Sequence, residues 1–558
     1  MLKNGVVEQT VRERGDWVSN IFTRPKPDGS VRVILDLTEL NNNVEYQHFK
    51  MTSLGTALEM LRKDSFLATI DLKDAYFSIP IRKQDRKLLK FQWGGKLYQF
   101  TVLPNGLSCA PRFFTKLLNP IFAQARLAGV ECFPYIDDIF ICANTKEECS
   151  RGVRILCELL DKAGLVVHPG KSSLIPRQKM TFLGFDIDTV EMRVTLTDDK
   201  IEKVELEIWD LLQQRYPVIR QCARVIGLLV AYTPGVDYGL AHVKHLERDK
   251  DAALVRTRRD FEGTMKISEK AKSDLAWWLM HIRVAQRKIR PELPDLQIDT
   301  DASMSGWGAF SGGKSAGGRW LLSEIDHINV LELEAVYLGL LTFCRKPGMN
   351  VHVRSDNTTA VAYVRKMGGV RSERCNKVAQ KIWNWAETNE SWITVSHVPG
   401  ILNTKADAAS RQFKDNLEWS LNPGIFQKIC DRFGTPNIDL FASRENAKCV
   451  CYMSRNFDPY SVAIDAFTQS WQDLQAYVFP PFSLIGRVLR KMEEDRPRSM
   501  IIVAPDWATA PWYTKLITGA SRIMKIGKKK KNIMPNDDYQ DNYPRGVGLI
   551  VSVFLKTD

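Results

Sequence analysis

Paired cysteines are missing from this chain. It has 11 cysteines in 558 residues, at irregular spacings, with no CxxC pair and no cluster of cysteine with histidine. A disulfide framework and a structural zinc site both need such spacing, so the sequence predicts neither. This cysteine usage suits a reducing compartment.

Long apolar segments are missing too. The N-terminus carries Glu8, Arg12, Glu13 and Arg14 where a signal peptide needs an apolar core. The longest clean apolar run, VIGLLVAY from Val225, is far too short to cross a bilayer. We therefore expect no membrane partner and an intracellular protein of the cytoplasm, the nucleus or both.

Acidic residues are fewer than basic ones. The chain has 78 Lys and Arg against 65 Asp and Glu, and its pI is about 9.1. Such a surplus favours a polyanionic partner such as nucleic acid. An ordinary basic soluble protein would show the same balance, so charge alone leaves both interpretations open.

Length and pattern predict a multidomain chain of α+β and α/β type. Short β-rich runs alternate with helical pieces over residues 1–190, and the pattern turns helical over 191–294. Two further α/β blocks follow over 295–412 and 413–558, separated by a joint rich in Pro and Gly. We expect four domains with these boundaries.

Two adjacent carboxylates form the first candidate site. Asp137 and Asp138 lie in FPYIDDIFICAN, between two apolar runs that predict a hairpin, and Asp71 ends the predicted strand FLATIDL. Alternation along a strand predicts that Tyr135 and Asp137 point one way and Ile136 into the core. Crowded carboxylates repel each other and so raise each other's pKa. Bound divalent cations would neutralise this repulsion. Simple turn chemistry would also explain a lone pair of aspartates.

The surrounding motifs make residues 1–190 similar to reverse transcriptases. In DLKDAYF, the resemblance implies Asp71 as a metal ligand and Tyr76 as the bulky side chain that rejects a ribose 2′-hydroxyl. In YIDD it implies Asp137 and Asp138 as the other ligands. In GLVVHPGKSSLIP it implies Lys171 as proton donor to the leaving pyrophosphate.

Two more motifs concern the incoming nucleotide, and both resemble the same family. LPNGLSCAPRFF implies contacts from Asn105 and a close backbone approach at Gly106, although Asn105 stands where many relatives carry Gln or Phe. KPDGSVRVILDLTELN resembles the fingers hairpin, so Arg32 and Lys26 would hold the triphosphate by charge-assisted hydrogen bonds. FLGFDI at Phe182 resembles the primer-grip hairpin. The implied fold is a right-hand polymerase with fingers, palm and a helical thumb or connection.

A second series of acids spans residues 295–412. The strand LQIDTDAS, the helix NVLELEAVYLGLL, the strand VHVRSDN and the segment HVPGILNTKADAASR carry these residues: Asp299, Asp301, Glu332, Asp356, His397 and Asp407. Scattered surface acids would explain any one of them. Four acids in this order favour a metal site.

This block resembles ribonuclease H. The resemblance implies Asp301, Glu332, Asp356 and Asp407 as ligands of two metal ions and His397 as the mobile histidine that assists turnover, with Asp299 a neighbour rather than a ligand. A reverse transcriptase joined to ribonuclease H is the organisation of retroelement polyproteins. Sequence stretches such as TIDLKDAY and GLSCAPRFFTK look most similar to those of DIRS-like retrotransposons. This resemblance covers roughly residues 5–412.

The last block resembles an adenine-specific DNA methyltransferase domain of Rossmann-like α/β type. Asp439, at the end of a predicted strand, would face S-adenosylmethionine. Active enzymes carry Asn or Asp before a Pro-Pro-aromatic motif, whereas this chain has Phe479 in FPPF, and phenylalanine accepts no hydrogen bond. We expect the fold to persist without adenine methylation and without use of S-adenosylmethionine.

Together these resemblances imply an RNA-directed DNA polymerase with linked ribonuclease H. Each active site would use two Mg²⁺ or Mn²⁺ ions, and the partners would be RNA template, DNA primer, RNA–DNA hybrid, deoxynucleoside triphosphates and other retroelement proteins. The alternative is a decayed or domesticated copy that only binds nucleic acid.

Overall fold

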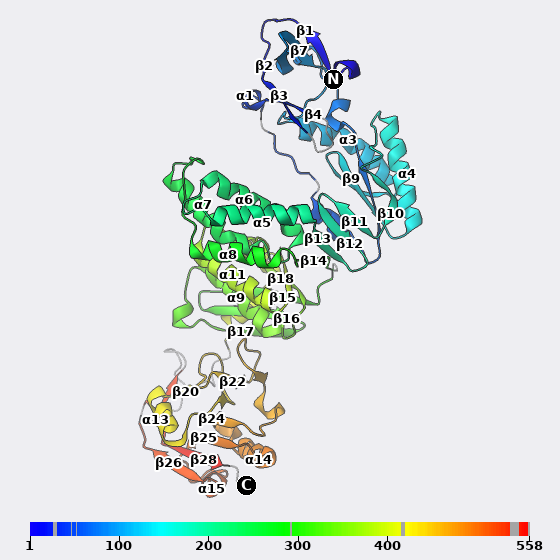
Figure 1. The fold of residues 1–558 in the computed structure, drawn as a ribbon. Helices are drawn as coiled ribbons and strands as arrows, with labels where there is room; N and C mark the ends of the chain where they lie inside the picture. Colours follow the sequence, from blue (N-terminus) through cyan, green and yellow to red (C-terminus); the bar gives the residue numbers. More distant parts are fainter. Residues whose placement is uncertain are drawn as a thin grey trace. The chain divides into compact units, whose positions relative to one another are not determined.

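The computed structural model divides the chain into two compact units, Met1–Glu292 and Leu293–Asp558. The structure describes residues 1–25, 31–45, 47–51, 53–290, 293–413, 419–529, 531–535 and 546–555. Figure 1 shows the elements of both units. Each unit mixes helices with several sheets, which confirms the expected multidomain α+β and α/β architecture.

The first unit begins with a small β-rich region. Its four-stranded sheet has the order β1-β7-β6-β2, and a separate pair joins β3 to β4. Bounds are β1 Val7–Thr10, β2 Val18–Ser19, β3 Ile21–Pro25, β4 Val31–Leu35, β6 Lys90–Trp93 and β7 Lys96–Phe100. Short helices follow β4 at α1 Thr38–Asn41 and α2 Leu54–Glu59.

A second sheet forms the centre of this unit. Its order is β10-β5-β9-β8, and α3 and α4 pack against it. Bounds are β5 Phe66–Asp71, α3 Ala110–Leu127, β8 Glu131–Tyr135, β9 Asp138–Ala143, α4 Lys146–Lys162 and β10 Ser173–Arg177. Ile70 and Ile139 contribute to the core shared with α3 and α4, whereas Leu67 and Phe140 contribute to the core on the other side. Burial of both faces explains why these strands read as continuous apolar runs.

The third sheet carries the helices that end the unit. Its order is β11-β12-β13-β14, and α5, α6, α7 and α8 share its core. Bounds are β11 Lys179–Phe182, β12 Phe185–Asp188, β13 Arg193–Leu196, α5 Asp198–Leu212, α6 Ile219–Tyr232, α7 Lys244–Arg256, α8 Glu269–His281 and β14 Arg287–Lys288. Leu183 and Gly184, both at positive φ, close the β11–β12 hairpin, as two-residue hairpin turns require. This sheet joins strands from both sides of residue 190, where a domain boundary was expected.

The second unit opens with a five-stranded sheet of order β17-β16-β15-β18-β19, in which β15, β18 and β19 are parallel. Bounds are β15 Leu296–Ala302, β16 Gly306–Ser311, β17 Lys314–Arg319, α9 Ile328–Phe343, β18 Asn350–Ser355, α10 Thr358–Arg365, α11 Glu373–Thr388, β19 Trp392–His397 and α12 Thr404–Arg411. Helix α9 is buried on nearly all sides because it packs on the sheet and is covered by α10 and α11. Below, residues 295–412 are called the five-stranded domain.

A seven-stranded sheet and a separate antiparallel pair, β20 with β27, form the rest of this unit, below called the C-terminal domain. The order of the seven-stranded sheet is β23-β22-β21-β24-β25-β28-β26; the first five strands are parallel, and β28 runs antiparallel to both neighbours. Bounds are β20 Trp419–Leu421, α13 Pro423–Phe433, β21 Ile438–Asp439, β22 Cys451–Ser454, β23 Ala463–Ile464, β24 Gln475–Val478, α14 Ile485–Asp495, β25 Ser499–Pro505, α15 Tyr513–Thr518, β26 Arg522–Ile526, β27 Ile533–Pro535 and β28 Leu549–Leu555. Apolar cores cover both faces. The strand order reverses between β21 and β24, where ligands bind in doubly wound sheets.

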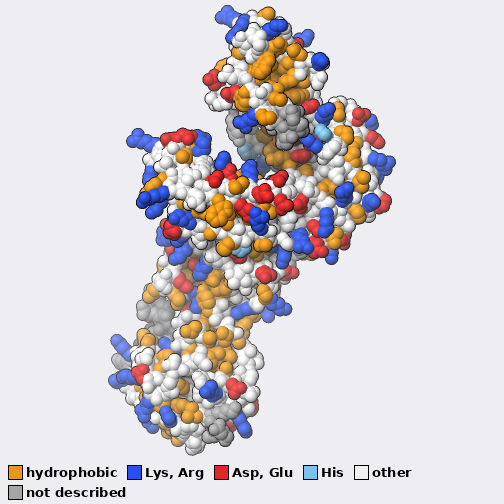
Figure 2. Space-filling view, viewed as in Figure 1, with side chains coloured by type: hydrophobic (Ala, Val, Ile, Leu, Met, Phe, Trp, Pro, Cys, Tyr) orange, Lys and Arg blue, Asp and Glu red, His pale blue; other side chains and the backbone are white. Residues whose placement is uncertain are grey.

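Surface charge is mixed on the face that Figure 2 shows. Basic side chains are spread over many elements, and acidic ones gather over α5. Within the described residues, no helix is both long and apolar enough to cross a membrane.

Candidate active sites

Three aspartates meet at one end of the central sheet of the first unit. Asp71 ends β5 and lies opposite Asp138, the first residue of β9. Asp137 occupies the turn between β8 and β9, and its carbonyl oxygen accepts a 2.9 Å hydrogen bond from the Leu72 N–H. Strand pairing therefore fixes two of the carboxylates, and the turn adds the third.

The turn differs from the expected alternation. Strand β8 ends at Tyr135, so Ile136 and Asp137 form the two-residue loop rather than continuing the strand. Ile136 adopts φ 56°, a left-handed backbone that is strained for a β-branched residue, and its side chain packs on the edge of the α3–α4 core. Rigid strands and this packing hold the turn against the strain.

Electrostatics show how crowded the aspartates are. Burial, followed by the charges of Asp137 and Asp71, raises the pKa of Asp138 to about 6. Burial and the charge of Asp71 also raise the pKa of Asp137. The Lys171 ammonium opposes both shifts, so it lies near the carboxylates. A divalent cation would remove the repulsion.

Backbone contacts place Lys171 there. The loop between α4 and β10 donates from the His168 N–H to the Asp71 carbonyl at 2.8 Å, and the Asp71 N–H donates to Ser172 Oγ at 3.0 Å. Lys171 stands between these two anchors and is itself exposed. Its ammonium therefore lies near the carboxylates while the side chain stays exposed to solvent.

Tyr76 lies beside the aspartates. It belongs to a 3₁₀ turn, Ala75–Ser78, and its ring meets Phe114 edge-on at 5.4 Å. Burial, with the charges of Asp137 and Tyr135, raises the pKa of Tyr76 to about 12, so its hydroxyl stays protonated. A bulky neutral ring therefore borders the site.

The other predicted nucleotide contacts are less fully described. Gly106 adopts φ 98°, and its carbonyl accepts a 2.9 Å bond from the Asn41 amide. Asn105 is exposed next to it. In the backbone register of β3 and β4, Arg32 lies opposite Arg24. Lys26 lies outside the described residues.

Three acids converge in the five-stranded domain. Asp301 on β15, Glu332 on α9 and Asp356 directly after β18 each offer an oxygen within 4.8 Å of the others. In the described part of the chain this is the only group of three Asp, Glu, His or Cys residues so close, and the aspartates of the first unit are more widely spaced.

This cluster fits a divalent cation. Glu332 is 4% exposed, and its Oε2 atom is buried without a hydrogen-bond partner. Burial and the charges of Asp301 and Asp356 raise the pKa of Glu332 to about 8, while burial, Asp356 and Asp407 raise that of Asp301 to about 6. Hard oxygen ligands with unmet charge are what Mg²⁺ and Mn²⁺ prefer.

The other acids of this block have different surroundings. Asp407 is half exposed and accepts a 2.6 Å bond from Arg411 Nε, one turn further along α12. Asp299 accepts hydrogen bonds from Nε and Nη2 of Arg354, each at 2.6 Å. His397 is exposed, and its Nε2 lies 3.0 Å from the backbone oxygen of Asp356.

Sequence reasoning missed Ser410. This buried serine donates from Oγ to Asp301 Oδ2 at 2.6 Å. It thereby occupies one oxygen of Asp301 and leaves the other for the cluster. Its place three residues after Asp407, on the same helix, was the available signal.

The C-terminal domain has an acid beside the place where its strand order reverses, between β21 and β24. Asp439 ends β21, is 2% exposed and accepts backbone N–H bonds from Phe441 at 3.2 Å and Lys448 at 3.1 Å. Burial raises its pKa to about 6. Phe479, directly after the neighbouring β24, is buried against Phe482. The strand ends thus present a carboxylate bound to its own loop and an apolar ring.

Two stretches of the chain match known families. Residues 24–187 match the family described as reverse transcriptase (RNA-dependent DNA polymerase), and residues 409–554 match DNA N-6-adenine-methyltransferase (Dam). The chain carries a reverse transcriptase domain. It also carries a Dam-like C-terminal domain.

Among curated proteins, the chain is similar to retrotransposon polyproteins. It is 28% identical to the transposon Tf2-3 polyprotein of Schizosaccharomyces pombe over 203 residues, and 27% identical to the Tf2-7 polyprotein over the same length. Each match covers 36% of this chain and only 15% of the relative. The similarity therefore concerns a small part of those polyproteins.

Solved structures that match the chain include foamy viral protease-reverse transcriptases. The form in complex with double-stranded DNA is 22% identical, with TM-score 0.45, covering 71% of this chain and 80% of that one. The form in complex with an RNA/DNA hybrid is 20% identical, with TM-score 0.43, covering 71% of this chain and 52% of that one.

Proposed function

We propose that this protein is an RNA-directed DNA polymerase with linked ribonuclease H activity, encoded by a DIRS-like retrotransposon. Its partners would be an RNA template, a DNA primer, the RNA–DNA hybrid and deoxynucleoside triphosphates. The meeting of Asp71, Asp137 and Asp138 at one sheet end, inside the reverse transcriptase domain, carries the polymerase proposal. Mg²⁺ or Mn²⁺, two ions per site, would act as Lewis acids on the attacking and leaving oxygens.

In this proposal the chain's own residues prepare nucleotidyl transfer. Asp71, Asp137 and Asp138 supply negative charge that is unfavourable until cations bind, which the raised pKa of Asp138 reflects. Lys171 protonates the leaving pyrophosphate, and Tyr76 closes the space beneath the sugar. Asn105, Gly106, Arg32 and Lys26 orient the incoming triphosphate.

Primer extension on an RNA template tests the polymerase. Asp137→Asn keeps the size of the side chain but removes its charge, so we expect extension to fall at least 100-fold with template binding nearly unchanged. Asp161→Asn, an exposed change on α4, serves as the matched control. Extension by Asp137→Asn at the wild-type rate would refute the site.

The hydrolytic proposal rests on the Asp301–Glu332–Asp356 cluster. Asp407 completes the set once a substrate or ion draws it from Arg411, and His397 assists turnover from the exposed edge, where its Nε2 lies 3.0 Å from the Asp356 backbone oxygen. Asp356→Asn should stop cleavage of RNA in a hybrid and spare primer extension, while Asp137→Asn should do the reverse. Loss of both activities in either folded variant would contradict two separate sites.

A decayed or domesticated copy remains the second candidate, because a basic chain can retain nucleic-acid binding after losing chemistry. A folded wild-type protein that binds RNA, yet neither extends primers nor cleaves hybrids in Mg²⁺ or Mn²⁺, would favour it.

We propose that the C-terminal domain no longer methylates adenine. Transfer needs an acceptor for the adenine amino group, and Phe479 has none. Asp439 is already bound by two backbone N–H groups. Incubation with labelled S-adenosylmethionine and unmethylated DNA should leave adenine unlabelled; label that disappears in Asp439→Ala would prove an active enzyme.

A further inference from the structure

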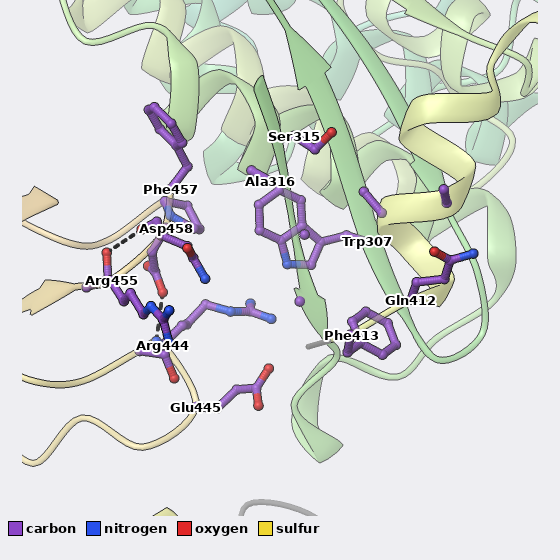
Figure 3. Close-up of a pocket in the computed structure, with 18 of the residues that line it drawn as sticks. Trp307, Ser315, Ala316, Gln412, Phe413, Arg444, Glu445, Arg455, Phe457 and Asp458 are labelled. Carbon is purple, nitrogen blue, oxygen red and sulfur yellow. Dashed lines mark hydrogen bonds between the residues drawn. The ribbon is translucent and has the colours of Figure 1, made fainter. Parts of the chain in front are cut away.

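A cleft of about 420 Å³ runs between the five-stranded domain and the C-terminal domain, inside the second unit. Strand β17 and helix α12 line one side, and the segments after β21 and β22 line the other (Figure 3). We call it the domain cleft. Its volume lies within the range of small-molecule sites in proteins.

Specific contacts hold the two walls together. Arg444 Nη1 forms a 2.7 Å ion pair with Glu324, and its Nη2 donates to the Arg319 carbonyl at 2.6 Å. The Arg319 N–H donates to Glu445 Oε1 at 3.1 Å. Arg345 donates to the backbone oxygens of Asp458 at 2.9 Å and Ser461 at 3.2 Å. The cleft is therefore built rather than left between loosely joined parts.

A buried donor without a partner faces this space. Trp307 lines the cleft and is 2% exposed, yet its indole Nε1 has no hydrogen-bond partner. Figure 3 shows the indole nitrogen turned toward the Arg444 side of the cleft. A buried donor without a partner is unfavourable, so a ligand with an acceptor at this point would be favoured.

The charges of the lining favour an anion. Lys405 and Arg455 reach the cleft, and within the described residues neither makes an ion pair. The two acids of the lining are engaged: Asp458 accepts bonds from the Tyr452 hydroxyl and the Arg444 and Tyr460 N–H groups, and Glu445 accepts from Arg319. These neutral donors leave both carboxylates charged, but the lining holds three basic side chains, Lys405, Arg444 and Arg455, against the two acids, so it carries one net positive charge.

Aromatic surface completes the lining. Phe413 is half buried, with the Arg319 guanidinium 4.8 Å from its ring centre, and Phe457 packs on Phe343 at 5.6 Å. Half-buried rings beside basic groups are what single-stranded nucleic-acid sites use, because bases stack on rings and phosphates pair with Lys and Arg.

We propose that the domain cleft binds one nucleotide unit of a single nucleic-acid strand. Lys405 and Arg455 take the phosphate, Phe457 or Phe413 stacks the base, and Trp307 Nε1 donates to an oxygen of the unit. Helix α12 carries Asp407 as well as the cleft residues Lys405 and Ala408, so a strand held here lies next to the candidate hydrolytic site. The binding site itself does not depend on that site being active.

Indole NMR signals test the proposal on the full chain. The protein is labelled with ¹⁵N in its tryptophan rings, the Trp307 signal is assigned from its absence in Trp307→Phe, and the 5′-phosphorylated trinucleotide of thymidine is titrated in. We expect the Trp307 signal to shift and saturate. Arg455→Ala and Lys405→Ala should each raise the midpoint about tenfold, since a charge-assisted bond contributes about 1.5 kcal/mol or more.

Arg490→Ala removes the same charge from the exposed side of α14 and should leave the midpoint unchanged. A Trp307 signal that stays fixed while other indole signals respond would overturn the proposal. Inorganic phosphate giving the same shift at the same concentration would overturn the nucleotide class.

A measurement on the wild type covers the case in which Trp307→Phe does not fold. A trinucleotide containing 4-thiothymidine is crosslinked by light, and the modified peptides are identified by mass spectrometry. Crosslinks on the peptides that carry Phe413 or Phe457 support the proposal. Crosslinks confined to residues 1–290 refute it.

Discussion

Tyr76 could act on a nucleotide sugar through the bulk of its ring or through hydrogen bonding by its hydroxyl. Its hydroxyl stays protonated, since burial raises the pKa to about 12, and its ring is braced edge-on by Phe114. The braced ring is a fixed bulky group, so we expect its size to exclude a ribose, and the Phe variant below tests whether the hydroxyl contributes. Both features come from packing, which sequence spacing alone does not specify.

Shortening Tyr76 should therefore admit ribonucleotides. For Tyr76→Val we expect the ratio of kcat/KM for deoxy- over ribonucleotides to fall at least tenfold, because a clash worth about 1.4 kcal/mol is removed. Tyr76→Phe keeps the ring and should keep the discrimination. Single-nucleotide incorporation on an RNA template gives both ratios; equal discrimination in Val and wild-type proteins would show that another group reads the sugar.

Helix α12 packs closely on the sheet because the strand beneath it carries a glycine at the point of contact. Gly308 on β16 lies so close to this helix that an added Cβ would overlap the Ala406 carbonyl oxygen and come within 2.5 Å of the Ser410 N. The helix carries Asp407 and Ser410, so its seat on the sheet sets the geometry of the acid cluster.

Gly308→Ala should consequently disturb both stability and hydrolysis. The helix must shift or the sheet must bend to make room for the methyl group. We therefore expect the free energy of unfolding to fall by roughly 2–4 kcal/mol and hybrid cleavage to be at least tenfold slower. Gly486→Ala on α14 meets nothing within 4 Å and should stabilise by about 0.5–1 kcal/mol. Thermal unfolding and cleavage assays distinguish the two; an unchanged Gly308→Ala protein would mean that α12 is not fixed by this contact.

Helix α8 contains a buried acid, Asp274, that links stability to pH. Asp274 lies 2.9 Å from His245 Nδ1 and 3.6 Å from His242 Nδ1. Burial alone would raise its pKa, but the two histidines outweigh burial and hold the pKa below its usual value. The folded state therefore binds this proton less readily than the unfolded state does.

Because the folded pKa is lowered, the stability that Asp274 contributes is lost at acidic pH. Asp274 adds stability above the unfolded pKa of about 4, and the contribution disappears as pH falls through the lower folded pKa. Asp274→Asn should lower the unfolding temperature at pH 7 and lose less stability than wild type on acidification. Calorimetry from pH 7 to pH 3 measures the difference, with Asp210→Asn on the exposed side of α5 as control. Parallel curves for wild type and Asp274→Asn would contradict the linkage.

At the scale of the whole molecule, the sequence predicted the mixed multidomain architecture because apolar periodicity and turn residues act locally. It also indicated where Asp71, Asp301 and Glu332 stand on their elements. It did not show Ile136 in a left-handed turn, the Ser410 bond to Asp301 or the contact of Arg444 with Glu324. These features arise from pairing and packing between segments far apart in the chain, which no local pattern encodes.

The contact between the C-terminal domain and the five-stranded domain can be measured for its contribution to stability. Arg444 is only 8% exposed in its ion pair with Glu324, which joins the C-terminal domain to the five-stranded domain. A double-mutant cycle of Arg444→Ala and Glu324→Ala should give a coupling of about 1–3 kcal/mol, because removing either partner leaves a poorly solvated charge. The pair Lys381–Glu334, whose lysine is 42% exposed, should give less than about 1 kcal/mol.

Arg444→Ala should also lower the temperature at which hybrid cleavage is lost, since the acid cluster and the interface belong to one compact unit. Cleavage measured after brief heating of the full chain gives that temperature, and Lys381→Ala provides the baseline for loss of an exposed ion pair. If Arg444→Ala lowers it no more than Lys381→Ala does, the C-terminal domain does not stabilise its neighbour through this contact.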